Sequence, residues 1–457
     1  MRIIIVGGGV VGFSLAEHLL REGHNLTLIE RNDKRCGQIS DKLDMQIITG
    51  NGARPRALKE AGIDGADMVL AVTPNNEVNI VVCSIAAQYG VSRRIARLRG
   101  DELSGESDLV DLDKLGVTWV IHPERAMVDH ILQFVETPHA VESANFENGR
   151  ILMRGYRVTA EMPLASKTPL QIRQEIAPEA VLFPAIVRQG RGMIPDGETE
   201  ILPGDILYTL FSRETLDTFL RLVNVEKKEG RKIIITGDSF STLVLAQALD
   251  NTGHHINLVD PSPEHARAAA DAFNKIEVLN GDCTEVDLLR ELNVDKASFF
   301  IAASDEVDYN MFSCLLAKAE GAHEVIAVSV GAQHDKLFNS IGIDHVINPR
   351  LTTAREILEI ISLGQIGAVV KLSDVDIEAV RFTVEPGSTV AGKSVIKIAR
   401  KLKKGSIIGV VVRGDTMILP DGETVIEEND HVILITRHKN VPPVTKLFQS
   451  RATSKRS

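Results

Sequence analysis

Short apolar runs alternate with helical patterns along the first quarter of the chain. The runs are rich in β-branched residues and fall at 3–6, 26–29, 68–72, 95–98 and 117–121. Helical patterns lie between them, for example over 11–22 and 78–89. Apolar runs without polar alternation are typical of strands covered on both faces, and their alternation with helices is typical of a parallel sheet. The pattern predicts a doubly wound α/β fold.

The whole pattern occurs twice, the second copy starting about 230 residues after the first. The opening strand Arg2-Ile3-Ile4-Ile5 is matched by Lys232-Ile233-Ile234-Ile235. Further matches follow in the same order, among them Cys83 with Cys314, Ile121-His122-Pro123 with Ile347-Asn348-Pro349, and Pro195-Asp196-Gly197 with Pro420-Asp421-Gly422. An ordered series of this kind indicates an internal duplication.

Each half has a second, smaller part, in which short strands are separated by turns rich in Gly and Pro. Predicted strands at 180–187 and 206–211 in the first half correspond to 407–412 and 431–436 in the second half. The sequence therefore predicts two tandem Rossmann-like domains with doubly wound parallel sheets, each followed by a small α+β domain. The Rossmann-like domains are expected at 1–124 and 231–350, and the small domains at 140–225 and 367–450.

An amphipathic stretch joins the two parts of each half, at 126–135 and again at 354–361. In the first copy, apolar residues such as Met127, Ile131 and Val135 form a broad helical face. This face has two interpretations. The helix either crosses over to pack on a partner subunit or closes its own domain.

A glycine-rich loop directly follows the first predicted strand. It contains the spacing GxGxxG and consists of Gly7, Gly8, Gly9, Val10, Val11 and Gly12. Between a strand and a helix, these glycines permit a tight turn, a close approach of the backbone to a pyrophosphate, and close packing of the helix on the sheet. The helix N-terminus then presents N–H groups and a positive dipole end to the phosphates. Glu30 ends the second strand, where a carboxylate binds the ribose hydroxyls, so the two features together predict a nucleotide site.

Further pocket residues are expected at the carboxyl ends of the other strands, where such folds bind ligands. These are Asn51 after the third strand, Thr73 and Pro74 after the fourth, and Arg97 near the fifth. The alternative is that each is an ordinary turn residue or, for Arg97, a surface charge.

The glycine loop does not distinguish NAD(H) from ATP or ADP, because all of these have ribose and phosphates. NAD(H) is the expected cofactor, with ATP or ADP as the alternative at the same site. Glu30 disfavours the 2′-phosphate of NADP through charge repulsion, but Arg31 follows it directly and leaves NADP open.

The second half departs from the pattern at its own loop, which runs Gly237-Asp238-Ser239-Phe240-Ser241-Thr242 and retains only the first glycine. Ser239 adds a Cβ, and Asp238 a negative charge, at the place where the backbone should approach phosphate. Asp260 still occupies the ribose position, and Asp282 and Asp305 follow strands. This site either binds a nucleotide weakly, binds a different one, or is vestigial; we favour a weak or vestigial site.

Charge and composition exclude several function classes. The chain has 457 residues and a formal net charge of -11, whereas a nucleic-acid-binding protein usually has a basic surplus that neutralises phosphates. We therefore expect no nucleic-acid partner. No stretch approaches the ~20 apolar residues of a membrane helix, and the N-terminus lacks the layout of a signal peptide. These features predict a soluble, cytoplasmic protein.

Motifs for catalysis or metal binding are not evident in the sequence. There is no GxSxG, Walker lysine, HExxH or kinase motif, and the four cysteines do not form a zinc-ligand pattern. An NAD-dependent dehydrogenase needs an acid or base near the nicotinamide, and the small domain offers only His139 nearby. We therefore expect no catalytic residue and no metal site, and the protein is not expected to be an enzyme.

These features together resemble the family of Trk-system potassium uptake proteins that carry two regulator-of-potassium-conductance (RCK) modules in tandem. The resemblance rests on Glu30 and the segments 3–12, 50–53, 71–73, 77–79 and 94–97 in the first half, and on 344–349 and 407–415 in the second half. The order of parts matches over nearly the full length.

The resemblance implies a nucleotide-binding regulatory subunit, peripheral on the inner face of the plasma (inner) membrane. It also implies a homo-oligomer, a tetrameric ring, which gates a potassium-conducting integral membrane subunit by a ligand-dependent conformational change. The family's nucleotide residues map onto Gly7, Gly8, Gly9, Val10, Val11, Glu30, Thr73, Pro74 and Arg97, and its second site onto 239–243, Asp260, Asp282 and Asp305. The alternatives are an NAD-dependent oxidoreductase and a free-standing nucleotide sensor without a membrane partner.

Overall fold

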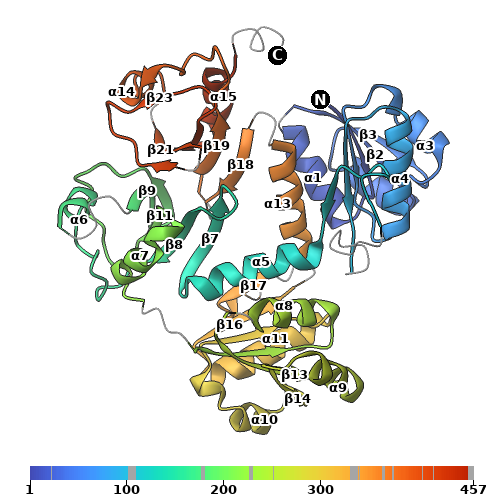
Figure 1. The fold of residues 1–457 in the computed structure, drawn as a ribbon, viewed down its shortest axis with the longest axis vertical. Helices are drawn as coiled ribbons and strands as arrows, with labels where there is room; N and C mark the ends of the chain where they lie inside the picture. The colour runs from blue at the N-terminus through green and yellow to red at the C-terminus, as the bar shows by residue number, and fades with distance from the viewer. Residues whose placement is uncertain are drawn as a thin grey trace. The chain divides into compact units, whose positions relative to one another are not determined.

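The structure, a computed structural model shown in Figure 1, describes the chain except for residues 22, 101–109, 176–180, 226–229, 251, 330–337, 339, 363–365, 373–374, 404, 415 and 451–457. The chain forms two units. The first contains Met1–Leu132 and Glu229–Leu358, and the second contains Gln133–Lys228 and Glu359–Ser457. Each unit therefore takes one segment from each half of the duplication.

The first repeat contributes a six-stranded parallel sheet to the first unit, with the order β3-β2-β1-β4-β5-β6. Every residue of Ile3–Val6 in the central strand is at most 2% exposed, as an apolar run without polar alternation predicts. The chain adds β2 and β3 on one side of β1 and β4 to β6 on the other side, and in such a sheet the ligand crevice forms between β1 and β4, where this order reverses. The strands are β1 (Arg2–Val6), β2 (Asn25–Glu30), β3 (Gln46–Thr49), β4 (Met68–Ala71), β5 (Arg93–Arg97) and β6 (Trp119–Ile121). The helices are α1 (Val10–Arg21), α2 (Asp33–Ser40), α3 (Pro55–Glu60) and α4 (Asn76–Gln88).

The second repeat builds the same sheet again in the same unit, with the order β14-β13-β12-β15-β16-β17. All its strand pairs are parallel. The strands are β12 (Lys232–Thr236), β13 (His255–Asp260), β14 (Glu277–Asn280), β15 (Phe299–Ala302), β16 (Glu324–Val328) and β17 (His345–Ile347). The helices are α8 (Phe240–Asp250), α9 (Pro263–Ala272), α10 (Val286–Glu291) and α11 (Val307–Ala319). The two predicted Rossmann-like sheets are thus both present.

One helix follows each parallel sheet, α5 (Pro123–Glu136) in the first repeat and α13 (Pro349–Ser362) in the second. The predicted apolar face of α5 is buried, since Met127 and Ile131 are each 0% exposed. The boundary between the two units falls inside both helices. Each helix therefore begins in the first unit and ends in the second.

The second unit contains two five-stranded antiparallel sheets, with the orders β10-β9-β11-β8-β7 and β18-β19-β24-β21-β22. They share one core, to which Phe146 and Tyr208 contribute from the first sheet and Val410 and Ile433 from the second. The first sheet has β7 (Ala140–Phe146), β8 (Ile151–Arg157), β9 (Val181–Arg188), β10 (Arg191–Met193) and β11 (Ile206–Ser212), with helices α6 (Pro169–Glu175) and α7 (Leu216–Leu222). The second has β18 (Ile366–Lys371), β19 (Glu378–Thr383), β21 (Ser406–Arg413), β22 (Thr416–Ile418) and β24 (His431–Thr436), with the pair β20 (Lys393–Ser394) and β23 (Val425–Ile426) and helices α14 (Val395–Ala399) and α15 (Val441–Phe448) beside it.

A charged cluster connects these two antiparallel sheets. The Glu147 side chain is 5% exposed, and its two oxygens lie 2.9 Å from Arg381 Nη1 and 2.9 Å from His431 Nδ1. Burial works to raise the pKa of Glu147, but the hydrogen bonds and charges of His431 and Arg381 outweigh it and lower the pKa to about 2. Glu147 is therefore an ionised, paired carboxylate at neutral pH.

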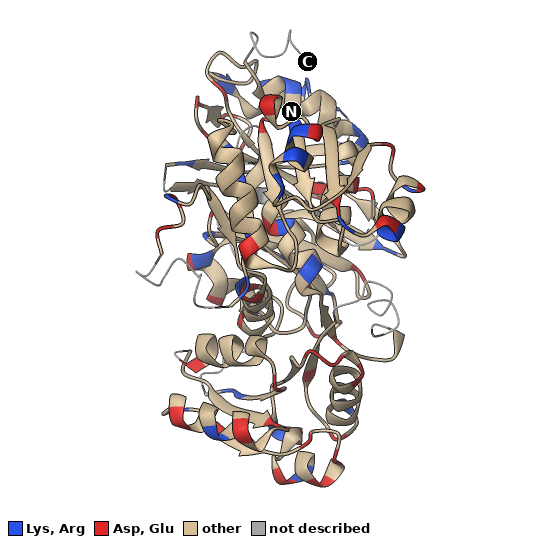
Figure 2. Cartoon of the chain, turned by 90° about the vertical axis from the view of Figure 1, so that its right-hand side faces the viewer, with Lys and Arg blue, Asp and Glu red and all other residues tan. Residues whose placement is uncertain are grey.

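Charged residues of both signs are interspersed along the helices (Figure 2). For example, α9 carries Glu264, Arg267 and Asp271, and α10 carries Asp287 and Arg290. Such mixing is typical of solvated helix faces. Within the described ranges, no helix is both long and apolar enough to cross a membrane.

Candidate nucleotide-binding site

The glycine loop joins β1 to α1 at the carboxyl edge of the first sheet. Gly7 has a φ of 111°, a value that residues with a Cβ rarely adopt. A Cβ on Gly12 would lie 1.9 Å from the carbonyl oxygen of Gly7, so only glycine allows the helix to approach this closely. A Cβ on Gly9, by contrast, would meet nothing within 4 Å. The loop thus combines a tight turn, close helix packing and an open space, the three features that a phosphate-binding loop requires.

Helix α1 begins at Val10, directly after this open space. The first N–H that bonds within the helix belongs to Phe13, which donates to the carbonyl oxygen of Gly9 at 2.9 Å. The N–H groups of Val10, Val11 and Gly12 precede it and have no acceptor inside the helix. Together with the positive end of the helix dipole, these groups favour an anion.

Glu30 lies beside the loop at the end of β2. Its Oε2 accepts a hydrogen bond from Gly8 N at 2.6 Å, and its Oε1 accepts one from Asn32 N at 2.9 Å. Arg35 Nε donates to the carbonyl oxygen of Gly8 at 2.9 Å. The carboxylate is therefore fixed by backbone donors, and each oxygen can still accept a second hydrogen bond, such as one from a ribose hydroxyl.

Asn79 in α4 connects the ends of β4 and β5 through side-chain hydrogen bonds. It is 0% exposed, and its Oδ1 accepts hydrogen bonds from the N and Oγ1 of Thr73 at 3.0 and 2.7 Å. Its Nδ2 donates to the carbonyl oxygens of Thr73 and Arg97 at 2.9 and 2.7 Å. In the sequence, Asn79 stands out only as part of the segment 77–79 that carries the family resemblance, whereas the structure shows that it positions two of the predicted site residues.

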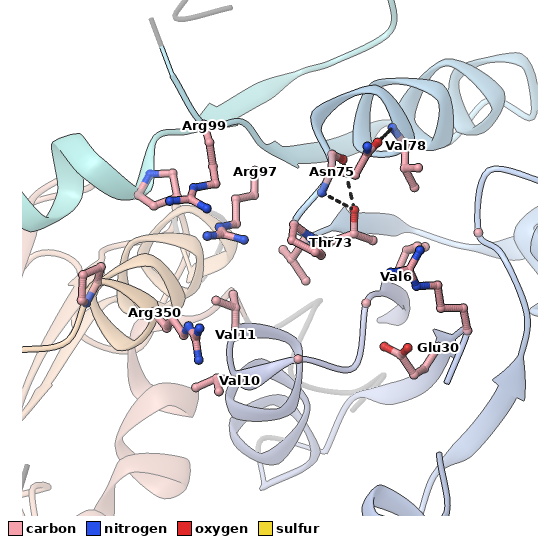
Figure 3. A pocket seen from close by; sticks show the side chains of 18 of the residues that line it. Val6, Val10, Val11, Glu30, Thr73, Asn75, Val78, Arg97, Arg99 and Arg350 are labelled. Atoms are coloured by element: carbon pink, nitrogen blue, oxygen red, sulfur yellow. Dashed lines mark hydrogen bonds between the residues drawn. The ribbon is translucent and has the colours of Figure 1, made fainter. Parts of the chain in front are cut away.

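These elements surround a pocket of about 790 Å³, a size that suits a small-molecule ligand (Figure 3). Most of the residues that the sequence predicts as nucleotide ligands line it. These are Gly7, Gly9, Val10, Val11, Glu30, Asn51, Thr73, Pro74 and Arg97. Gly8 and Gly12 are not among the lining residues, because Gly8 bonds to Glu30 and Gly12 packs against Gly7.

The second repeat supplies another part of the pocket wall. Its lining residues include Ser241, Ser304, Asp305 and Arg350, the last of which stands near the start of α13. Of the residues predicted for a second site, Ser241 and Asp305 line this pocket. Ser239, Asp260 and Asp282 do not.

Three arginines extend into the pocket, namely Arg97, Arg99 and Arg350 (Figure 3). Arg99 Nε donates to Glu124 Oε1 at 3.0 Å, whereas Arg97 Nε is buried and has no hydrogen-bond partner within the described part of the chain. Burial and the neighbouring charge of Arg99 lower the pKa of Arg97 to about 10, with Glu124 opposing the shift and Arg350 adding to it.

Sequence reasoning missed both Arg99 and Arg350. The sequence offers one signal for Arg350, a difference between the repeats at the residue that follows a shared proline. This residue is the acidic Glu124 after Pro123 in the first repeat and the basic Arg350 after Pro349 in the second.

The corresponding crevice of the second repeat is crossed by the side chain of Tyr309. Its hydroxyl lies 2.6 Å from Thr236 Oγ1 and accepts a hydrogen bond from Cys283 N at 3.3 Å. In the first repeat, Val78 stands in the place of Tyr309, Val6 in that of Thr236 and Gly52 in that of Cys283. These residues are smaller or apolar, and all three line the pocket.

The second glycine loop is also closed by its own hydrogen bonds. Ser239 Oγ donates to the carbonyl oxygen of Ala303 at 2.6 Å, and Asp238 Oδ1 accepts from Ser304 Oγ at 2.9 Å. Asp260 is 2% exposed, and burial raises its pKa. These contacts favour the interpretation of a weak or vestigial second site.

Comparison with protein-family models gives matches in both halves of the chain. The TrkA-N domain model matches residues 3–123 and 233–349, and the TrkA-C domain model matches residues 379–449. The two TrkA-N matches coincide with the two parallel sheets.

Relatives match the chain over nearly its full length. It is 30% identical to the Trk system potassium uptake protein TrkA of Azorhizobium caulinodans, over 98% of this chain and 99% of that protein. It is 29% identical to the protein of the same name from Halomonas elongata, over 98% of this chain and 99% of that protein. With a TrkA homolog from Archaeoglobus fulgidus the identity is 27%, over 98% of this chain and 100% of that protein.

Solved structures share the fold at lower sequence identity. The crystal structure of the GsuK RCK domain has a TM-score of 0.58 and 19% identity, covering 98% of this chain and 94% of that one. The GsuK channel bound to NAD has a TM-score of 0.59 and 19% identity, covering 98% of this chain and 78% of that one. The predicted fold class, tandem Rossmann-like domains with small α+β domains, is confirmed.

Proposed function

Because the chain belongs to the TrkA family of Trk-system potassium uptake proteins, we propose that it is the nucleotide-binding regulatory subunit of a potassium uptake system. Nucleotide binding in the first repeat changes the conformation of the chain and thereby gates a potassium-conducting integral membrane subunit. The observation that carries this proposal is the pocket at the first glycine loop, where Glu30 and the open space beside Gly9 flank the N-terminus of α1.

The proposed ligand is NAD(H), with ATP or ADP as the alternative in the same pocket. The side chains present fit such a ligand. Glu30 would accept hydrogen bonds from ribose hydroxyls, the N–H groups of Val10 and Val11 would bind phosphate oxygens, and Arg97 would neutralise phosphate charge. The structure of the GsuK channel with NAD, which has the same fold, supports NAD(H).

A regulatory role fits the pocket better than hydride-transfer catalysis does. Among the described residues that line it there is no histidine, lysine, tyrosine or cysteine. These are the side chains that commonly act as acid, base or nucleophile beside a nicotinamide. We therefore propose that the nucleotide is an effector and not a co-substrate.

Helix α5 offers a physical route from the pocket to the second unit. Near its N-terminus Glu124 lines the pocket and pairs with Arg99. At its C-terminus Glu136 Oε2 lies 3.5 Å from Arg154 Nη2, and Arg154 is 0% exposed in β8. A ligand whose phosphates attract Arg99 competes with Glu124, which shifts the start of a helix whose end is anchored in an antiparallel sheet. Such coupling requires that the ligand bind the two arrangements with different affinity.

The remaining parts of the proposal are the site of action and the assembly. We place the protein on the cytoplasmic face of the plasma (inner) membrane, as a tetrameric ring beneath the membrane subunit. Family membership supports this placement. A free-standing sensor would instead remain in the soluble fraction when the membrane subunit is present.

Calorimetric titration of the purified protein with NADH, NAD, ATP and ADP tests the proposed function. At least one of them is expected to bind, and Glu30→Ala is expected to weaken it by about tenfold or more, since hydrogen bonds to a charged acceptor contribute roughly 1.5–3 kcal/mol. Glu17→Ala is the matched control, because Glu17 on α1 is partly exposed, does not line the pocket and pairs with Arg21 along the same helix. Binding that Glu30→Ala leaves unchanged would show that the ligand lies elsewhere.

A further inference from the structure

The charge of the pocket is opposite to that of the chain. Five arginines and three acidic residues line it, which gives an excess of two positive charges, whereas the whole chain has a net charge of -11. The arginines are Arg31, Arg35, Arg97, Arg99 and Arg350, and the acidic residues are Glu30, Glu124 and Asp305. A local positive excess within an acidic protein attracts anions and retains them.

The pairing of these groups shows which cations are available to a ligand. Arg99 is bonded to Glu124, but the buried Nε of Arg97 has no partner among the residues that the structure describes. A buried donor without an acceptor is unfavourable, and like charges held together add to the penalty. An anionic group between Arg97 and Arg350 would accept a hydrogen bond from Arg97 Nε and would reduce the repulsion between the two guanidinium groups.

The positions of these side chains suggest which part of a nucleotide they would meet. Figure 3 shows Glu30 on one side of Val11 and the guanidinium groups of Arg97 and Arg350 on the other. A nucleotide whose ribose is at Glu30 and whose first phosphates are at the α1 N-terminus would extend its last phosphate toward the arginines. NAD has no such group, because both of its phosphates are esterified.

We propose that Arg350 of the second repeat, together with Arg97 of the first, binds the terminal phosphate of a nucleoside di- or triphosphate held by the first glycine loop. The inference rests on the proposed nucleotide site. It makes Arg350 a specificity-determining residue, which distinguishes ATP and ADP from NAD in one pocket. A ligand with a terminal phosphate then links β5 of the first repeat to α13 of the second, whereas NAD leaves this link unmade.

Calorimetry on the full chain without Mg²⁺ tests this assignment, using ATP and NAD with wild type, Arg350→Ala and Arg350→Glu. Arg350→Ala is expected to weaken ATP binding roughly tenfold, the usual size for one charge-assisted phosphate contact, and Arg350→Glu more strongly. NAD binding is expected to change by less than about twofold in Arg350→Ala. Arg355→Ala is the matched control, since Arg355 is exposed on the same helix and does not line the pocket.

Each other outcome overturns the proposal in a recognisable way. If Arg350→Ala weakens ATP and NAD equally, or if Arg355→Ala has the same effect, Arg350 does not contact a terminal phosphate. If ATP affinity is unchanged in both Arg350 variants, the arginine takes no part in binding. If the wild-type chain binds neither ATP nor NAD, the nucleotide site itself is wrong, and not only the role of Arg350.

Discussion

Two alanine substitutions three residues apart in the glycine loop are expected to affect different properties of the protein, one its stability and the other its nucleotide binding. Gly12→Ala should destabilise the fold, because its Cβ would lie 1.9 Å from the carbonyl oxygen of Gly7. Gly9→Ala should leave the fold intact and remove nucleotide binding, because its Cβ would meet no protein atom within 4 Å. The methyl group would instead occupy the space that a phosphate needs.

The expected magnitudes follow from these contacts. Relief of the Gly12 clash requires a helix shift of about 1 Å, and overpacking of this kind usually costs about 1–3 kcal/mol or more. At Gly9 the backbone φ is not in the left-handed region. Alanine there should change the free energy of unfolding by less than about 1 kcal/mol, in the stabilising direction, by restricting the unfolded chain.

Thermal denaturation with and without nucleotide measures both effects in one assay. A ligand at one hundred times its Kd stabilises the folded state by about 2.7 kcal/mol, which should raise the wild-type Tm by roughly 5 °C or more. Gly9→Ala should have a Tm close to wild type without ligand and no shift with it. Gly12→Ala should have a Tm lower by roughly 2–12 °C without ligand, since 1 kcal/mol shifts the Tm of a domain of this size by about 2–4 °C.

Two results would refute this reasoning. A Gly9→Ala protein as unstable as Gly12→Ala would mean that the space beside Gly9 is not open. A Gly9→Ala protein that retains the full ligand shift would mean that no phosphate binds beside the loop.

Three further expectations concern other parts of the chain. Asn79→Ala should lower stability by about 2–3 kcal/mol, because buried polar groups at Thr73 lose their partner, and it should also weaken nucleotide binding; denaturation and calorimetry measure the two. For Glu147 the folded pKa of about 2 lies below the ordinary glutamate pKa of 4.5, so its stabilising effect is present above pH 4.5 and is lost as the pH falls toward 2. Glu147→Gln should remove about 3 kcal/mol at pH 7 and nearly nothing at pH 2, and an equal loss at both pH values in chemical denaturation would contradict this pairing. Calorimetry should give one nucleotide per chain, because Tyr309 crosses the second crevice, and two sites of similar affinity would show that the crevice opens.

Much of the fold could be predicted because its strongest signals are local. Strands such as Ile3–Val6 are buried on both faces and therefore appear as uninterrupted apolar runs. The turn at Gly7 and the carboxylate at Glu30 lie within short distances of these strands along the chain. Their spacing alone indicates that they meet at one edge of the sheet.

The rest of the site could not be predicted because it depends on contacts between distant segments. Arg350 reaches the pocket from the second repeat, and no local pattern indicates which face of that repeat meets the first. The two interpretations of the amphipathic stretch at 126–135 likewise did not include a helix that begins in one unit and ends in the other. The role of Asn79 is visible only from its hydrogen bonds to Thr73 and Arg97.

Potassium uptake into membrane vesicles tests the central claim most directly. The vesicles would contain the potassium-conducting subunit with either the wild-type chain or Gly9→Ala bound on the cytoplasmic side, and uptake would be measured with and without the nucleotide identified by calorimetry. Nucleotide should change the uptake rate with the wild-type chain and leave it unchanged with Gly9→Ala, while both proteins sediment with the vesicles. An equal response with the two proteins, or no response with the wild type, would contradict regulation through the first glycine loop.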